Sequence, residues 1–338
     1  MKKFACYVYI LIVFCCSLWT SLFLWTYQPW GIWSTLLLLS IILLLSILTI
    51  FHGFKTSEYR AYFHVVYWLG FLSTLLVFFS LAPKNDRVWQ PEVDKIIQYE
   101  FIDGQVEIRN VRNFIWESAD KYDVKWETRR YSLEKIESVD LIVSHFMPGP
   151  IAHAFISFGF EGGEHLAFSL EVRQEKGEGF SSIGGFFRQY ELALVVGDEN
   201  DVIYTRTNIR NEDLYIYPIK IKKNEMQILF LEYLNKANRL NNTPRWYNTL
   251  ISNCTTILFD LLEHTVGSVP RDYRIVLPGL LPYYLYDYEQ LDQSLTVKQW
   301  MQRNHVNPKT QHLKNGPDDL NMPFSELIRM HNPVSTQN

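Results

Sequence analysis

Hydrophobic residues are concentrated in three long runs at the start of the chain. The runs cover residues 4–25, 32–51 and 61–82. Each has about 20 residues, the length that a helix needs to cross the hydrocarbon core of a bilayer. His64 is the only Asp, Glu, Lys, Arg or His inside them. The pattern therefore predicts three transmembrane helices and a membrane domain over residues 1–84.

Beyond residue 84 the pattern changes to shorter segments typical of an α+β domain. Apolar and polar residues alternate over residues 152–160 and 165–173, and the Gly-rich turn between them predicts a β-hairpin. Further strands are expected over 105–115, 125–132, 139–146, 190–196, 202–207 and 214–221, with a turn at 197–200. Helices are expected over 224–239 and 254–265, and an irregular chain beyond Pro270. We therefore predict one α+β domain over residues 85–338.

The charge distribution separates the two parts further. The chain has 338 residues, and residues 1–84 hold only five of its 32 Lys and Arg and one of its 36 Asp and Glu, so the remainder is acidic. An acidic domain argues against binding nucleic acids by charge. No His, Cys and Asp residues have metal-ligand spacing, and Gly184-Gly185 does not fit a phosphate-binding loop. We expect no metal and no cofactor.

The positions of Lys and Arg predict the orientation in the membrane. Lys2 and Lys3 precede the first run, and Lys55 and Arg60 lie in the second loop, whereas the first loop, residues 26–31, has no Lys or Arg. The positive-inside rule then places the N-terminus and the second loop in the cytoplasm. Three spans deliver residues 85–338 to the other side of the membrane.

One of the four cysteines lies outside the membrane runs. Cys6, Cys15 and Cys16 are typical of apolar side chains in a membrane helix, which leaves Cys254 as the single cysteine of the soluble part. Asn253 precedes it as a helix N-cap, and apolar residues at helical spacing follow. The first turn of a helix favours a thiolate, and its N–H groups can receive an oxyanion. Cys254 is therefore a candidate nucleophile, against the simpler interpretation of a small buried cysteine.

A thiol nucleophile needs a base, and the base needs a group that orients it. His153 opens the predicted hairpin, and His165 lies at its turn as a weaker candidate. A two-residue turn pairs His153 with Val172, while a three-residue loop pairs it with Glu171 or Arg173. The sequence leaves the register, and therefore the orienting group, open.

Several ordered motifs resemble the periplasmic domain of Lnb-type bacterial proteins over roughly residues 90–290. They are VEIRNVRNF (106–114), AHAFISFGF (152–160), SLEVRQEKG (169–177), RQYEL (188–192), YTRTNIR (204–210) and YNTLISNCTT (247–256). The resemblance implies a permuted papain-like fold in which the histidine precedes the cysteine, the plan shared by NlpC-type peptidases and lecithin:retinol acyltransferase. Carried onto this chain, it implies Cys254 as nucleophile, His153 as base and Glu171 as third member. Four further positions match the family without an assigned chemical role: Arg173, Tyr190, Glu191 and Arg206. The candidate supporting residues of the site are Asn253, Arg173, His165 and Tyr190.

The activity that the resemblance implies is lipoprotein N-acylation at the bacterial inner membrane. A phospholipid would donate an acyl chain to the cysteine as a thioester, and the α-amine of a lipidated N-terminal cysteine of a lipoprotein would accept it. One alternative is a thiol amidase or peptidase acting on cell-wall peptides, which a wide polar groove would favour. Another is a silent binding module of the envelope, which predicts that His153 and Cys254 lie more than ~6 Å apart. The better-known members of the family carry their membrane anchor after the domain, whereas here three runs precede it.

Overall fold

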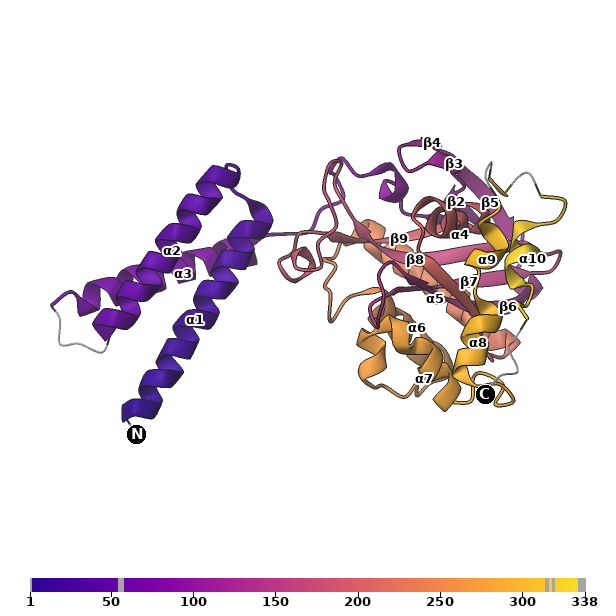
Figure 1. The fold of residues 1–338 in the computed structure, drawn as a ribbon. Coiled ribbons are helices and arrows are strands. Elements are labelled where there is room, and N and C mark those ends of the chain that lie inside the picture. Colours follow the sequence, from indigo (N-terminus) through magenta and orange to yellow (C-terminus); the bar gives the residue numbers. More distant parts are fainter. Residues whose placement is uncertain (1, 54–57, 314–315, 318–319, 334–338) are drawn as a thin grey trace. The chain divides into compact units, whose positions relative to one another are not determined.

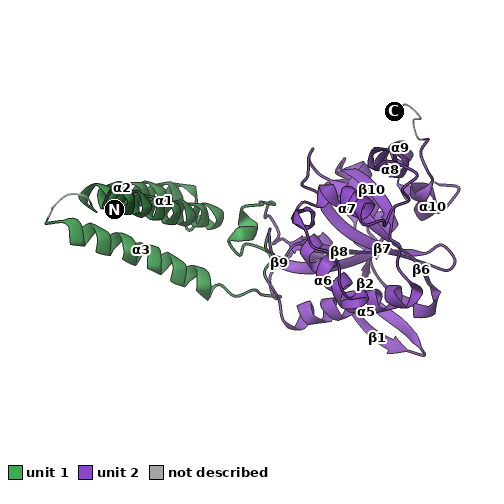
Figure 2. Cartoon of the chain, turned by 90° about the horizontal axis from the view of Figure 1, so that it is seen from below, with its two compact units in different colours: residues 1–84, 179–191, 246–249 green, residues 85–178, 192–245, 250–338 purple. Residues whose placement is uncertain are grey.

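The computed structural model describes residues 2–53, 58–313, 316–317 and 320–333. These residues form two compact units, coloured separately in Figure 2. The helical unit comprises residues 1–84, 179–191 and 246–249, and the sheet unit comprises residues 85–178, 192–245 and 250–338. Two short segments of the predicted soluble domain therefore belong with the membrane runs.

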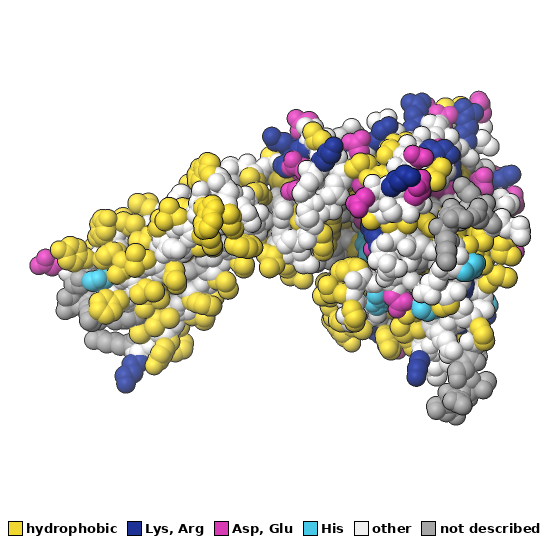
Figure 3. All heavy atoms as spheres, turned by 45° about the horizontal axis from the view of Figure 1, so that its top comes forward, with side chains coloured by type: hydrophobic (Ala, Val, Ile, Leu, Met, Phe, Trp, Pro, Cys, Tyr) yellow, Lys and Arg dark blue, Asp and Glu magenta, His cyan; other side chains and the backbone are white. Residues whose placement is uncertain are grey.

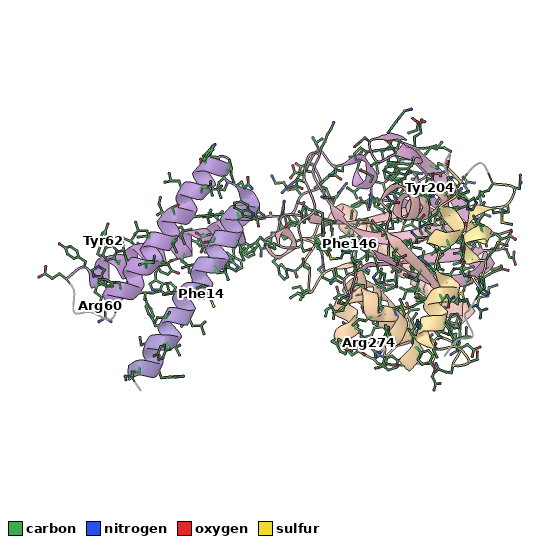
Figure 4. The ribbon with its side chains drawn as sticks, in the orientation of Figure 1. Phe14, Arg60, Tyr62, Phe146, Tyr204 and Arg274 are labelled. Carbon is green, nitrogen blue, oxygen red and sulfur yellow. The ribbon has the colours of Figure 1, made fainter. Side chains whose placement is uncertain are left out.

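Three long helices form the bulk of the helical unit: α1 (Lys2–Tyr27), α2 (Ile32–Gly53) and α3 (Arg60–Ser80). All three are long and apolar enough to cross a membrane, as the sequence predicted. Figure 3 shows their surface covered by hydrophobic side chains, while charged side chains gather on the sheet unit. Arg60 and Tyr62, labelled in Figure 4, lie at the start of α3. Lys55, one of the residues that set the predicted orientation, lies outside the described residues.

Polar side chains join the three helices. The Ser17 hydroxyl lies 2.7 Å from the Ser46 hydroxyl and 2.8 Å from the Tyr67 hydroxyl, which also donates to the carbonyl of Val13. Hydrogen bonds of this kind hold helices together in lipid, where neighbouring apolar faces gain little from association. The helices of this unit therefore associate through interhelical hydrogen bonds as well as through van der Waals packing.

A large mixed sheet forms the centre of the sheet unit (Figure 1). Its strands are β1 (Gln98–Ile102), β2 (Gln105–Arg112), β5 (Trp126–Tyr131), β6 (Ile136–His145), β7 (His153–Phe160), β8 (His165–Arg173), β9 (Glu191–Asp198) and β10 (Asp213–Pro218). The order across the sheet is β1-β2-β9-β8-β7-β6-β10, with β5 paired to β2. The β2–β9 pair is parallel, while β6, β7 and β8 form an antiparallel meander. A separate small hairpin consists of β3 (Ile115–Ser118) and β4 (Lys121–Asp123).

Helices cover both faces of the sheet. On one face, Phe158 and Phe168 pack against Phe230 and Tyr233 of α5 (Lys223–Asn242), and α6 (Cys254–Val266) contacts α5 and β7. On the other face, Phe155 belongs to a core shared with α4 (Glu199–Tyr204) and α10 (Phe324–Arg329), and α9 (Asn307–Thr310) contacts α10. The remaining short helices are η1 (Pro91–Val93), η2 (Leu133–Lys135), η3 (Gly184–Phe186), η4 (Thr205–Ile209), η5 (Tyr273–Val276), η6 (Pro278–Leu280), α7 (Leu281–Asp287) and α8 (Val297–Asn304).

The structure differs from the sequence expectation in two places. The strand expected over residues 202–207 is wrong, because α4 and the π-helical turn η4 occupy this stretch. The Asp198 side chain accepts a hydrogen bond from the N–H of Asn200 and so starts a helix where a β-turn was expected. Beyond Pro270 the chain is also more regular than expected, with a series of short helices.

Candidate active site

Cys254 is the first residue of α6 and is buried. The Asn253 side chain caps this helix, because its Oδ1 accepts hydrogen bonds from the N–H groups of Thr255 (3.1 Å) and Thr256 (2.9 Å). The Thr256 hydroxyl in turn accepts from the N–H of Asn253, which completes a capping box. The local sequence therefore fixes the thiol at the positive end of the helix.

The capping geometry also changes one expectation. The N–H groups of Thr255 and Thr256 were candidates for receiving an oxyanion, but both are taken by the Asn253 side chain. The cap of Asn253 is therefore structural, and these two first-turn amides are not free to bind a substrate oxygen.

The register of the β7–β8 hairpin brings Glu171 opposite His153. Ile156 pairs with Phe168 and Gly159 with His165, and the Phe160 N–H bonds the carbonyl of Glu164 across a three-residue loop. Continued toward the start of β7, this register pairs residue 153 with residue 171, so both side chains lie on the same face of the sheet. Of the alternatives that the sequence left open, the structure has the one that selects Glu171.

Electrostatic interactions and hydrogen bonds connect the cysteine, the histidine and the glutamate. The Cys254 thiol and the His153 imidazole lie near enough for each to shift the pKa of the other. His153 Nε2 lies 2.7 Å from the Ser169 hydroxyl and 3.4 Å from Glu171 Oε1. The Ser169 hydroxyl donates to the same Glu171 oxygen over 2.6 Å. Ser169 thus bridges base and carboxylate, and the imidazole is held by its Nε2 edge.

A buried arginine holds the carboxylate from the other side. Arg206 Nη2 donates to Glu171 Oε1 over 2.5 Å, and its guanidinium stacks 4.8 Å from the centre of the Phe155 ring. Its Nε lies 3.8 Å from Glu212, which also accepts a hydrogen bond from the Ser144 hydroxyl. The site therefore contains a connected network of charges that extends from Cys254 to Glu212.

Electrostatics favour an ion pair between cysteine and histidine. Burial alone would raise the pKa of the Cys254 thiol, but the charge and hydrogen bond of His153 and the N–H of Ala154 lower it below its usual value. Burial would likewise depress the pKa of His153, but Glu171 and Cys254 raise it to about 10. Against the penalty of burial, Arg206 and His153 hold the pKa of Glu171 well below its usual value. A thiolate beside an imidazolium is the reactive form of such a pair.

A cavity of about 510 Å³ opens in the sheet unit, beyond the ends of β6 and β10. It lies beside the loop that leads from His145, at the end of β6, to His153, at the start of β7; Phe146, labelled in Figure 4, belongs to this loop. Its lining residues are His145, Phe146, Met147, Pro148, Gly149, Asn211, Asp213, Tyr215, Gly279, Leu280, Tyr283 and Met301. This lining mixes apolar and polar groups, and neither His153 nor Cys254 belongs to it. It is therefore neither a purely apolar acyl tunnel nor a purely polar groove.

The structure does not bring every expected supporting residue to the thiol. Arg173 is buried and donates to the carbonyls of Val93 and Asp94, so it ties β8 to the segment before β1. His165 lies at the turn end of the hairpin, where Nδ1 is 3.0 Å from the carbonyl oxygen of Gly163. Tyr190 belongs to the helical unit, where its hydroxyl donates to the carbonyl of Gly179.

Two residues of the network were not singled out from the sequence. Ser169 was identifiable in principle, because it precedes Glu171 by two residues and must share its face of the strand. Glu212 follows the segment that was wrongly expected to be a strand, so no sequence signal placed it beside Arg206.

Among the described residues, no group of three or more His, Cys, Asp and Glu is arranged to hold a metal ion.

These features define a membrane protein with a mixed sheet-and-helix domain that carries a buried cysteine–histidine pair. Residues 122–279 match the family model of the Lnb N-terminal periplasmic domain. The match confirms the resemblance predicted from the motifs, over a shorter range than residues 90–290, and the matched range includes His153, Glu171 and Cys254. The chain matches no curated protein and no solved structure. With the three apolar helices, the family indicates a membrane protein whose domain is extracytoplasmic.

Proposed function

We propose that the protein is a membrane-bound thiol acyltransferase that N-acylates lipoproteins at the bacterial inner membrane. The observation that carries the proposal is the electrostatic pairing of Cys254 with His153, whose Nε2 lies 3.4 Å from Glu171 Oε1. It occurs in a domain similar to the Lnb periplasmic domain, on a chain with three helices suited to a bilayer. The N-terminus is then cytoplasmic and the domain extracytoplasmic.

The proposed first step forms a thioester. His153 and Cys254 exist as imidazolium and thiolate, and the Sγ atom attacks the carbonyl carbon of a phospholipid acyl ester. The ester C–O bond breaks, and the departing alkoxide takes the proton from His153. The products are S-acyl-Cys254 and a lysophospholipid.

The proposed second step transfers the acyl chain. The α-amine of a lipidated N-terminal cysteine attacks the thioester carbon, and His153 takes the proton that the nitrogen loses. The C–S bond breaks, so the products are an amide and the regenerated ion pair. Glu171, bonded to Nε2 directly and through Ser169, keeps the imidazole oriented and supports its positive charge. This leaves Nδ1 as the ring nitrogen that serves the thiol.

The family plan behind this mechanism is a permuted papain-like core. Two features support it: the histidine precedes the cysteine in sequence, and the cysteine begins a helix packed against the strand that carries the histidine. The electrostatic interaction between His153 and Cys254 counts against a silent binding module, which requires the two residues to lie apart. A hydrolase acting on cell-wall peptides would use the same groups, so the acceptor must be determined by experiment.

The test is the intact mass of the full-length protein after incubation with phospholipid vesicles. We expect a mass increase equal to one acyl group, located on Cys254, which disappears when a diacylated lipoprotein peptide is added. Cys254→Ala should show no adduct, whereas the matched variant Cys15→Ala should show the same adduct as the unmodified chain. Lipoprotein N-acylation that persists in Cys254→Ala membranes would disprove the proposal. Release of muropeptides without lipid turnover would establish the hydrolase instead.

A further inference from the structure

Residues 179–191, here called the docking loop, lie between β8 and β9 in sequence but cluster with the membrane helices (Figure 2). Tyr27, the last residue of α1, donates its hydroxyl proton toward two carbonyls of this loop. The distances are 2.9 Å to the oxygen of Phe187 and 2.7 Å to that of Arg188. The backbone of the docking loop is therefore fixed to the C-terminal end of the first apolar helix.

Arg188 fixes the same loop to the end of α3. Its Nη1 donates to the carbonyls of Phe78 (3.0 Å) and Leu81 (3.3 Å), the last of which is the C-cap of α3. Its guanidinium also stacks on the rings of Phe78 and Phe79, at 4.4 and 5.4 Å. A cation that binds the final carbonyls of a helix complements the negative end of its dipole.

Aromatic packing completes the attachment. The Phe187 ring lies 5.6 Å from the ring of Trp19 and 6.2 Å from that of Phe23, both on α1. Arg188 has a φ of 58°, which an arginine adopts only where its surroundings hold it there. Hydrogen bonds, ring stacking and backbone conformation therefore all hold the docking loop at the helix ends.

The docking loop presents large apolar side chains away from these contacts. Phe180, Ile183 and Phe186 are 51, 45 and 41% exposed. They lie in a unit most of whose other exposed apolar side chains belong to the spanning helices. Aromatic residues also surround the end of α1, where Trp25, Tyr27, Trp30 and Trp33 form the belt expected at a membrane interface. An apolar loop at the depth of this aromatic belt lies at the boundary between lipid headgroups and acyl chains.

We propose that the docking loop inserts into the lipid leaflet that contains the C-terminal ends of α1 and α3. Its occupant is phospholipid, because the exposed residues continue the lipid-facing surface of the helices. This inference goes beyond the proposed acyl transfer and does not depend on it. Residues 179–191 then contact lipid in addition to the three spanning helices.

The segment that precedes the candidate nucleophile is tied to this loop. The Tyr247 N–H donates to the carbonyl of Tyr190, and the Thr249 hydroxyl donates to that of Ser182, both over 2.9 Å. Thr249 is five residues before Cys254 in the sequence. The membrane-inserted loop and the start of the cysteine segment therefore form one hydrogen-bonded assembly within the helical unit.

Spin labels on the full chain in phospholipid nanodiscs test the insertion. The four native cysteines are replaced by alanine, and one cysteine is introduced as Ile183→Cys, Phe186→Cys or, as matched control, Ile228→Cys on α5, a residue of similar exposure. We expect labels at 183 and 186 to be relaxed more strongly by molecular oxygen, which partitions into lipid, than by a water-soluble nickel chelate. The label at 228 should show the reverse.

Labels at both 183 and 186 that behave like the label at 228 would overturn the proposal. A second measurement uses Arg188→Ala, which removes the bonds to Phe78 and Leu81. We expect the label at 183 to gain nickel accessibility in this variant, while the label at 228 does not change. Because Cys254 is absent from every labelled chain, the result is independent of the proposed chemistry.

Discussion

The β7–β8 hairpin contributes to two networks of similar composition, and only one of them reaches a thiol. Each network has a carboxylate that accepts a hydrogen bond from a serine of the hairpin and forms an ion pair with an arginine. The first network is Ser169, Glu171 and Arg206, and the second is Ser157, Glu199 and Arg329. In both, the serine-to-carboxylate distance is 2.6 Å.

The two networks differ in what lies beyond the carboxylate. Glu171 contacts His153, which interacts electrostatically with Cys254, and the Glu171 side chain is 21% exposed. Glu199 is fully buried and pairs in bidentate fashion with Arg329, which also bonds Asp140. Access and a neighbouring nucleophile therefore distinguish a candidate reaction site from an ion pair that holds α4 and α10 to the sheet.

A lowered carboxylate pKa does not by itself distinguish the network of Glu171 from the network of Glu199. Burial opposes ionisation in both cases, yet Arg329 lowers the pKa of Glu199 to about 2, and Arg206 holds the pKa of Glu171 well below its usual value. Strongly shifted carboxylates are common at functional sites and also in structural ion-pair networks. The interaction of the histidine with the cysteine is the discriminating feature.

The largest expected effect comes from the two histidines of the hairpin. His153→Ala removes the base, and we expect the rate of acyl transfer to fall by at least about 10⁴-fold. His165→Ala lies at the turn end and should change the rate by less than about 2-fold. Single-turnover thioester formation on Cys254, measured by mass, gives both rates. Equal losses in the two variants would mean that the chemistry does not use the Cys254–His153 pair.

The two glutamates should separate activity from stability. Glu171→Gln removes the charge that supports the imidazolium, and we expect the rate to fall about 10²–10³-fold. Glu199→Gln breaks an ion pair whose carboxylate is fully buried and should cost about 3–5 kcal/mol of unfolding free energy, with the rate per folded molecule unchanged. Denaturant unfolding in detergent and thioester formation measure the two effects. A Glu199→Gln variant as inactive as Glu171→Gln would remove the distinction between the networks.

The pH dependence should also differ between the two variants. Thiol reactivity should rise with pH through the lowered pKa of Cys254 and fall as pH passes the raised pKa of His153, about 10. Since the pKa of His153 is raised on folding, its pairing stabilises the protein fully below about pH 6.5 and less as pH rises to about 10. Glu171→Gln should move the upper limit to lower pH, whereas Glu199→Gln should leave it in place. The rate of thioester formation across pH measures this, because the departing alkoxide needs the proton of the imidazolium; an unchanged limit in Glu171→Gln would show that Glu171 does not support the imidazolium.

Local sequence signals were sufficient for much of the fold. The spanning helices follow from uninterrupted apolar runs, the hairpin from alternation around a glycine turn, and the start of α6 from Asn253. The strand expected over residues 202–207 failed because Val202, Ile203 and Thr207 favour strands, whereas the Asp198 cap and the tertiary pairing of Arg206 impose a helix. Tertiary contacts thus overrode a local preference at a residue of the site.

The candidate site was only partly readable from sequence. Cys254 and His153 were proposed from local context, but the position of Glu171 depended on the length of one turn, because one residue of slip reverses the face of every side chain. Glu212 lies on a loop whose approach to Arg206 depends on three-dimensional packing. The docking loop shows the same limit, because nothing in the pattern of residues 179–191 indicates that Tyr27 and Arg188 join it to the helices.

The smallest expected effect concerns the two serines that bridge the networks. Ser169→Ala removes the hydroxyl that links His153 Nε2 to Glu171, and we expect about a 10-fold loss of rate, because Glu171 still contacts the imidazole at 3.4 Å. Ser157→Ala leaves Glu199 with both bonds from Arg329, so it should cost about 1 kcal/mol of stability and no activity. The rate of thioester formation in Ser169→Ala should also begin to fall at a lower pH than the rate in Ser157→Ala. Identical rates and profiles in the two variants would show that Ser169 serves packing, as Ser157 does, and that Glu171 orients the histidine unaided.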